Sequence, residues 1–99
     1  MSTDTVTQST VQTEIKLPSM FKVIYINDEQ TTMEFVVESL MSVFGLTVER
    51  SEEITLEIHT EGSAVVAIYP FEMAEQKGLE VTIMARNQGY PLQVKVEED

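Results

Sequence analysis

The sequence contains no cysteine, only one histidine, few basic residues and no long apolar run. The absence of cysteine excludes disulfide bonds, thiolate catalysis and cysteine-ligated zinc, and gives no reason to expect an oxidising compartment. Six basic residues against seventeen acidic ones give a formal net charge of -11, which repels nucleic-acid phosphates and anionic lipid headgroups. No stretch approaches the roughly twenty apolar residues of a membrane span. We therefore expect no nucleic-acid or membrane partner, and a cytoplasmic location, or an organelle stroma if a transit segment has been removed.

Length and composition are those of one small domain. With 99 residues, 42% of them apolar, the chain can build a single modest core but not two. Residues 1–18 are dominated by Ser, Thr, Gln and isolated Val without an aromatic residue, which predicts a flexible, disordered N-terminal tail. Residues 19–99 form the folded domain, which we expect to be monomeric.

Three helices are predicted from apolar spacing and from cap residues. The clearest has Met33, Leu40 and other apolar residues at helical spacing, with Thr31 as N-cap and Gly45 as terminator. A second helix should run over about residues 48–60 and end at Gly62. A third should begin near residue 70 and end before residue 89.

Three strands are predicted around these helices. Residues 20–26 alternate in a way that fits a strand buried more on one face. The continuous apolar run at residues 64–69 predicts the central strand, covered on both faces. Residues 92–97 alternate as an edge strand does. The sequence thus predicts an α+β fold with a small three-stranded antiparallel sheet and helices mainly on one side, in the order β-α-α-β-α-β.

Polar residues are concentrated between the first predicted strand and the first predicted helix. Asn27, Asp28 and Glu29 follow the strand directly, and His59 stands shortly before the glycine that ends the second helix. An ammonium group has three donors and no acceptor, so about three aimed oxygens or unprotonated nitrogens would bind it, and binding should weaken in mild acid if His59 is one of them. On spacing alone, a plain turn and an ordinary helix-end histidine remain open.

Metal binding and catalysis have little support in the sequence. His59 with Asp28 and Glu29 is a thin ligand set without cysteine. No nucleophile motif surrounds Ser63, so a triad with His59 and Asp28 is not indicated. We expect no catalytic residue, no metal and no cofactor.

The motifs at residues 27–37 and at His59-Thr60-Glu61-Gly62 together resemble the ClpS family, adaptors of the AAA+ protease Clp. The likeness continues through Tyr69 and residues 74–77 to Tyr90-Pro91-Leu92, and so covers essentially everything after the tail. It implies recognition of N-degrons, which are proteins whose first residue is bulky and apolar or aromatic. Substrates would be delivered to the N-terminal domain of a ClpA- or ClpC-like unfoldase.

The resemblance also implies roles for individual residues. The free α-amino group would be held by Asn27, Asp28 or Glu29, and His59. Glu72 and Lys77 would face the unfoldase. The substrate's first side chain would enter an apolar pocket lined by Thr31, Met33, Val36, Thr55, Ile58 and Leu92.

The chain departs from the family pattern at several of these positions. Glu29 stands where a second aspartate is usual, and Gln30 and Thr32 replace an aromatic residue and a proline. Thr55 replaces a larger apolar residue, often methionine, so one pocket wall is smaller and carries a hydroxyl. These departures leave open an alternative, a Clp-binding regulator or inhibitor with altered or no N-degron specificity.

Overall fold

Three strands and three helices make up the computed structural model, which describes residues 17–99. The strands are β1 (Met20–Ile26), β2 (Ser63–Pro70) and β3 (Gln93–Glu98), and the helices are α2 (Met33–Phe44), α3 (Val48–Glu61) and α4 (Phe71–Asn87). All strand pairs are antiparallel. The predicted α+β class and element order are confirmed. Residues 1–16 of the predicted tail lie outside the described part of the chain.

The central strand is β1, not the strand at residues 64–69, so that prediction was wrong. The sheet order is β2-β1-β3, and β2 forms an edge. Within β2, Ala64 and Val66 are buried, whereas Val65 and Ile68 are 39% and 45% exposed. The apolar run therefore arises from apolar side chains on an exposed face, which sequence periodicity cannot tell from burial on both faces.

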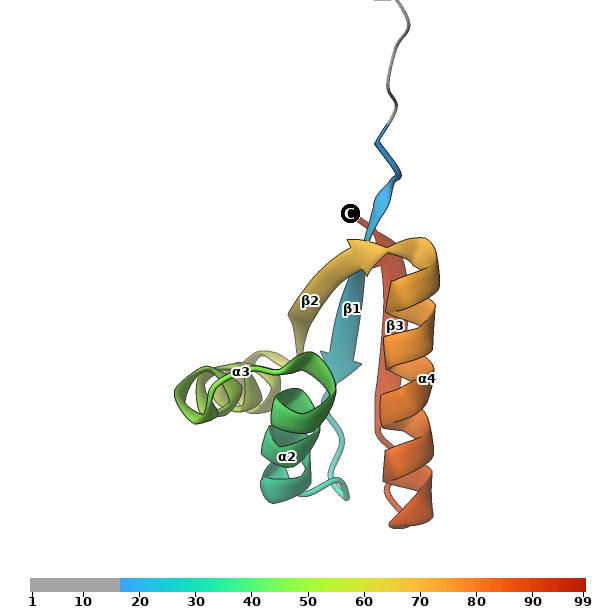
Figure 1. The fold of residues 1–99 in the computed structure, drawn as a ribbon. Helices are drawn as coiled ribbons and strands as arrows, with labels where there is room; N and C mark the ends of the chain where they lie inside the picture. Colours follow the sequence, from blue (N-terminus) through green and yellow to red (C-terminus); the bar gives the residue numbers. More distant parts are fainter. Residues whose placement is uncertain (1–16) are drawn as a thin grey trace, which may run out of the picture.

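One face of the sheet is covered by α4, which contacts all three strands (Figure 1). Val23 and Tyr25 of β1 point into this layer and are fully buried, while Lys22 and Ile24, which alternate with them, are only half-buried. Period-two alternation along β1 is the reason, because successive side chains point to opposite faces. Helices therefore cover mainly one side, as predicted.

A helical pair, α2 and α3, packs at the end of the sheet where β1 finishes (Figure 1). Leu40 of α2 and Ile54 and Ile58 of α3 belong to the same core as the buried face of β1. Each helix ends at a glycine in the left-handed region, Gly45 at φ 69° and Gly62 at φ 95°, where a side chain would be strained. Both terminators were predicted.

The start of α2 lies one residue later than predicted. Thr32, not Thr31, is the N-cap, and its Oγ1 accepts from the Phe35 N–H at 3.1 Å. Two adjacent threonines made the choice ambiguous. Thr31 is not free to cap, because its hydroxyl donates to an Asp28 carboxylate oxygen at 2.7 Å.

No helix within residues 17–99 is long and apolar enough to cross a membrane.

Candidate functional site

The β1–α2 junction and the end of α3 are joined by a backbone hydrogen bond. The Asn27 N–H donates to the Gly62 carbonyl at 2.9 Å. Gly62 is the C-cap of α3, and His59 lies in its last turn. The bond therefore brings two predicted amine-binding segments, far apart in the sequence, to one place.

Asp28 organises the turn that leads into α2. One of its carboxylate oxygens accepts from the backbone N–H groups of Gln30 and Thr31, at 2.8 and 2.7 Å, and the other accepts from the Thr31 hydroxyl. A side chain that bonds to the backbone two residues ahead is typical of an Asx-turn. These bonds hold the backbone of the turn that contains the exposed Glu29.

These contacts also change the acidity of Asp28. Burial acts to raise the pKa of its carboxyl, but the hydrogen bonds from Thr31 and Gln30, with the positive charge of Arg86, outweigh it and lower the pKa below its ordinary value. The Asp28 carboxylate is therefore ionised near neutral pH and adds negative charge to the junction.

A cavity of about 330 Å³ opens between this turn, α2 and α3. Its polar end is formed by predicted amine ligands, and its apolar part by predicted pocket residues. The lining residues are Asn27, Asp28, Glu29, Thr31, Met33, Val36, Thr55, Ile58 and His59. The structure thus brings the predicted amine-binding and side-chain-pocket residues together in one concave site, with the exception of Leu92.

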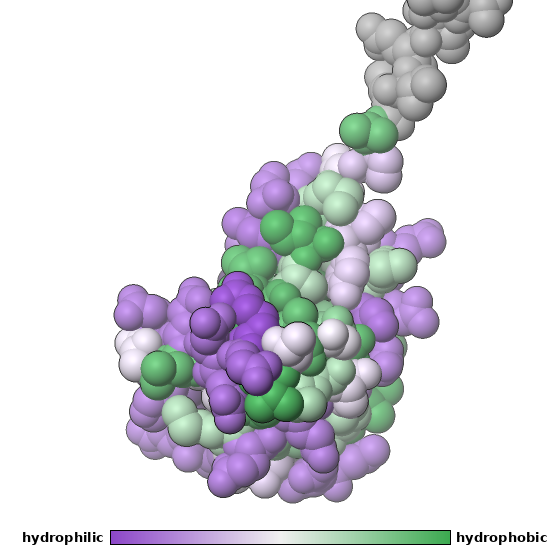
Figure 2. Space-filling model, turned by 60° about the vertical axis from the view of Figure 1, so that its left-hand side comes forward, coloured by the Kyte–Doolittle hydropathy of each residue, from purple (hydrophilic) through white to green (hydrophobic). Residues whose placement is uncertain are grey.

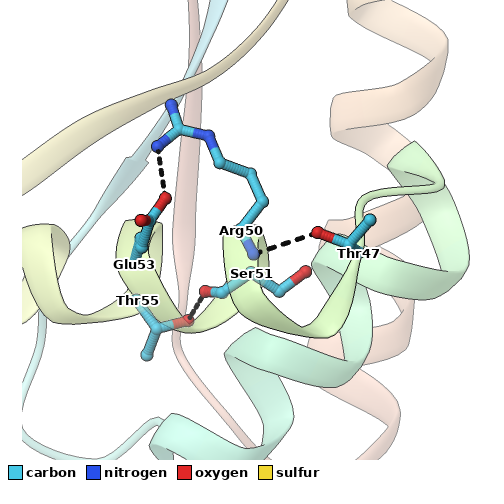
Figure 3. A network of polar contacts seen from close by, with 5 residues as sticks. All are labelled: Thr47, Arg50, Ser51, Glu53 and Thr55. Atoms are coloured by element: carbon cyan, nitrogen blue, oxygen red, sulfur yellow. Dashed lines mark hydrogen bonds and ion pairs between the residues drawn. The ribbon is translucent and has the colours of Figure 1, made fainter.

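The wall formed by Thr55 is less polar than the sequence indicates. Thr55 is buried, and its hydroxyl donates to the Ser51 carbonyl one turn earlier, at 2.7 Å (Figure 3). Because this donor is already used within α3, the residue offers the cavity a small, mainly apolar surface. Thr47 is the N-cap of the same helix, and its Oγ1 accepts from the Arg50 N–H at 3.1 Å.

Leu92 lies in the core and not among the residues that line the cavity. Arg86, which sequence reasoning missed, fixes the segment around it: its guanidinium donates to the carbonyls of Tyr90 and Leu92, both at 2.9 Å. Arg86 also acts electrostatically on Asp28. The only signal in the sequence was a basic residue in the last turn of a helix, which ordinarily indicates a C-terminal cap.

Within residues 17–99, no group of three or more His, Asp or Glu side chains is placed to hold a metal ion.

The described residues form a small α+β domain with a polar-rimmed, apolar-floored cavity. Residues 16–95 match the family model of the ATP-dependent Clp protease adaptor protein ClpS. The chain belongs to the ClpS family, and it is an adaptor of an ATP-dependent Clp protease, not an enzyme. The resemblance inferred from the motifs is confirmed.

Relatives in several bacteria match nearly the whole chain. The ATP-dependent Clp protease adapter protein ClpS of Campylobacter jejuni is 44% identical over 93 residues, which are 94% of this chain and 97% of that protein. The protein of the same name from Nautilia profundicola is 43% identical over 98 residues, 99% of each chain.

A solved structure shares the fold. Agrobacterium tumefaciens ClpS2 bound to L-phenylalaninamide superposes with a TM-score of 0.81 at 32% identity, covering 84% of this chain and all of that one.

Proposed function

We propose that this adaptor binds the free α-amino group and the bulky apolar or aromatic first side chain of N-degron substrates, and delivers them to a Clp AAA+ unfoldase in the cytoplasm. The observation that carries the proposal is the cavity at the β1–α2 junction, whose polar end and apolar floor suit the two parts of such a ligand. L-phenylalaninamide, the ligand of the Agrobacterium protein, has both parts: a free amine and a benzyl side chain.

The amine would be bound at the polar end of the cavity. Both carboxylate oxygens of Asp28 already accept hydrogen bonds from their own turn, so this residue supplies mainly negative charge and loop order. Asn27, Glu29 and His59 are exposed around the same cavity and have acceptor atoms free to turn toward an ammonium group. We therefore assign direct amine contact to these three.

The first side chain would be bound by Val36, Ile58, Thr55 and Met33. Val36, Ile58 and Thr55 are nearly fully buried and form a fixed floor, whereas Met33 is 43% exposed at the rim. A flexible thioether at the rim can close over an unbranched stem but leaves little room for a branch at Cβ. This arrangement favours aromatic and leucine side chains over isoleucine and valine.

The unfoldase partner would contact the start of α4 through Glu72 and Lys77. Glu72 is exposed in the first turn. Lys77 is half-buried, and its Nζ donates to the Val43 carbonyl at 3.1 Å, which ties α4 to α2. The other N–H groups of the Lys77 ammonium would then donate to a partner. We take this partner to be the N-terminal domain of a ClpA- or ClpC-type unfoldase.

Titration with matched peptides tests the proposal. A peptide that begins with Phe should bind, and acetylation of its α-amino group should weaken binding by at least about a hundredfold, because each charge-assisted hydrogen bond lost is worth about 1.5–3 kcal/mol. Asn27→Ala should weaken binding of the free peptide. Asn87→Ala, at an exposed asparagine of α4 that does not line the cavity, should not.

Equal affinity for free and acetylated peptides would contradict amine recognition. That result would favour the alternative, a Clp-binding regulator without N-degron specificity.

A further inference from the structure

A long apolar groove runs between α2 and α3 and continues from the cavity. Its volume is about 970 Å³, and it shares Met33 and Thr55 with the smaller site. The other residues that line it are Glu34, Val37, Glu38, Met41, Ser42, Glu52 and Leu56. The two depressions therefore adjoin at Met33 and Thr55.

The floor of the groove is a helical stripe. Met33, Val37 and Met41 follow one another at intervals of four residues on α2, so they lie on one face of the helix. Leu56 faces them from α3 and is 57% exposed, and Met41 is 37% exposed. Apolar surface framed by hydrophilic side chains is visible on the side of the molecule where α3 comes forward (Figure 2).

The rim of the groove carries charge of one sign. Glu34 and Glu38 line it from α2 and Glu52 lines it from α3, all three exposed. Among the lining residues, all of which lie in the described part of the chain, none is Lys or Arg. An apolar floor with three carboxylates complements a segment that combines an apolar side chain with neighbouring lysine or arginine.

The dimensions suit a short extended peptide. Met33, at the cavity, and Met41, at the far end, are separated by about 12 Å along α2, since an α-helix rises 1.5 Å per residue. An extended chain advances about 3.3 Å per residue, so three or four residues cover this length. A peptide whose first residue fills the cavity would reach the far end of the groove near its fifth residue.

We propose that this groove binds the substrate segment that directly follows the first residue, with preference for an apolar side chain at the third to fifth position flanked by lysine or arginine. The inference rests on the proposed function, because the first residue anchors the chain at one end of the groove. It adds a second determinant of substrate choice, formed mainly by residues that do not line the cavity, such as Val37, Met41 and Leu56.

Peptides with a common Phe at the first position and different segments at positions three to five test this proposal. A Leu at the fourth position, flanked by Lys, should raise affinity about fivefold to tenfold over a Ser flanked by Ser, as expected for partial burial of one leucine. Met41→Gln should abolish that gain and leave affinity for the serine peptide unchanged. Met73→Gln, at a methionine of α4 that is 46% exposed and lines neither depression, should preserve it.

Charge is tested separately with Glu38→Lys, which should weaken binding of the lysine-flanked peptide more than that of the serine peptide, and most strongly at low salt.

If all Phe-first peptides bind alike, the groove proposal is overturned while the proposed function stands. If no Phe-first peptide binds, both are overturned. If acetylated leucine–lysine peptides bind as tightly as free ones, the groove acts independently of the first residue, which also overturns the proposal.

Discussion

Replacing each of two buried serines by alanine should change the stability of the protein in opposite directions. Ser39 and Ser51 are both fully buried in helices. Within the part of the chain that the structure describes, the Ser51 hydroxyl has no hydrogen-bond partner. A buried unpaired hydroxyl costs about 1–3 kcal/mol. Serine is also less favourable than alanine inside a helix, by about 0.5 kcal/mol.

Ser51→Ala should therefore raise the free energy of unfolding by about 1–2 kcal/mol, after allowance for the small loss of packing. In a domain of this size, each kcal/mol shifts Tm by about 4–8 °C. The lining residue Thr55 is unaffected, because it bonds to the backbone carbonyl of residue 51 and not to its side chain. Peptide affinity should stay the same.

Ser39→Ala is the matched control. The Ser39 hydroxyl donates to the Val36 carbonyl at 2.9 Å and so accepts from the buried Tyr25 hydroxyl at 2.7 Å. Burial raises the pKa of Tyr25, so the phenol stays neutral and its O–H needs an acceptor. Removing the partner should lower the free energy of unfolding by about 1–3 kcal/mol, less the gain in helix propensity.

Denaturant unfolding of the wild type and both variants under one set of conditions would measure the difference. The expected order of stability is Ser51→Ala, wild type, Ser39→Ala. If Ser51→Ala destabilises the protein by as much as Ser39→Ala does, the Ser51 hydroxyl has a partner and the reasoning is refuted.

The remaining predictions concern the cavity residues Met33 and Thr55, the carboxyl of Asp28, and the segment at residues 2–14. Met33→Ala should allow peptides that begin with Ile or Val to bind. The wild type should prefer Phe over Leu as first residue by about 1–3 kcal/mol, and Thr55→Met should reduce that preference. Competition binding that finds Leu and Phe equal in the wild type would contradict the Thr55 prediction. Because folding lowers the pKa of Asp28, its ionised carboxylate should stabilise the protein fully above about pH 4, and this stabilisation should be lost as the pH falls through the folded-state pKa. In unfolding experiments, the free energies of unfolding of Asp28→Asn and wild type should therefore differ less in acid than at pH 7. Deletion of residues 2–14 should leave peptide affinity unchanged and abolish accelerated degradation of an N-degron reporter by the matching protease, and normal delivery by the truncated chain would contradict a role in delivery.

The helices could be predicted because their signals are local. The apolar stripe through Leu40 and the glycines at 45 and 62 depend only on helix geometry and on φ. Strand order depends on pairing between distant segments, and no periodicity distinguishes an apolar edge strand from a central one. That is why β2 was misplaced.

The site could be predicted in part. The family resemblance predicted the residues around the cavity, but not which oxygens of Asp28 its own turn would use. The core position of Leu92 and the contacts of Arg86 depend on the packing of α4 against the segment before β3. Such long-range contacts leave no local pattern in a sequence.

Amide chemical shifts recorded during titration with L-phenylalaninamide show directly whether the cavity binds a free amine together with an aromatic side chain. We expect changes at the cavity, at Asn27, Thr31, Ile58 and His59, and none on the outer face of α4, for example at the exposed Ile83. N-acetyl-phenylalaninamide, with the same side chain but no free amine, should leave these shifts almost unchanged. Equal shifts with both compounds, or changes confined to residues away from the cavity, would contradict recognition of the free amine at this cavity.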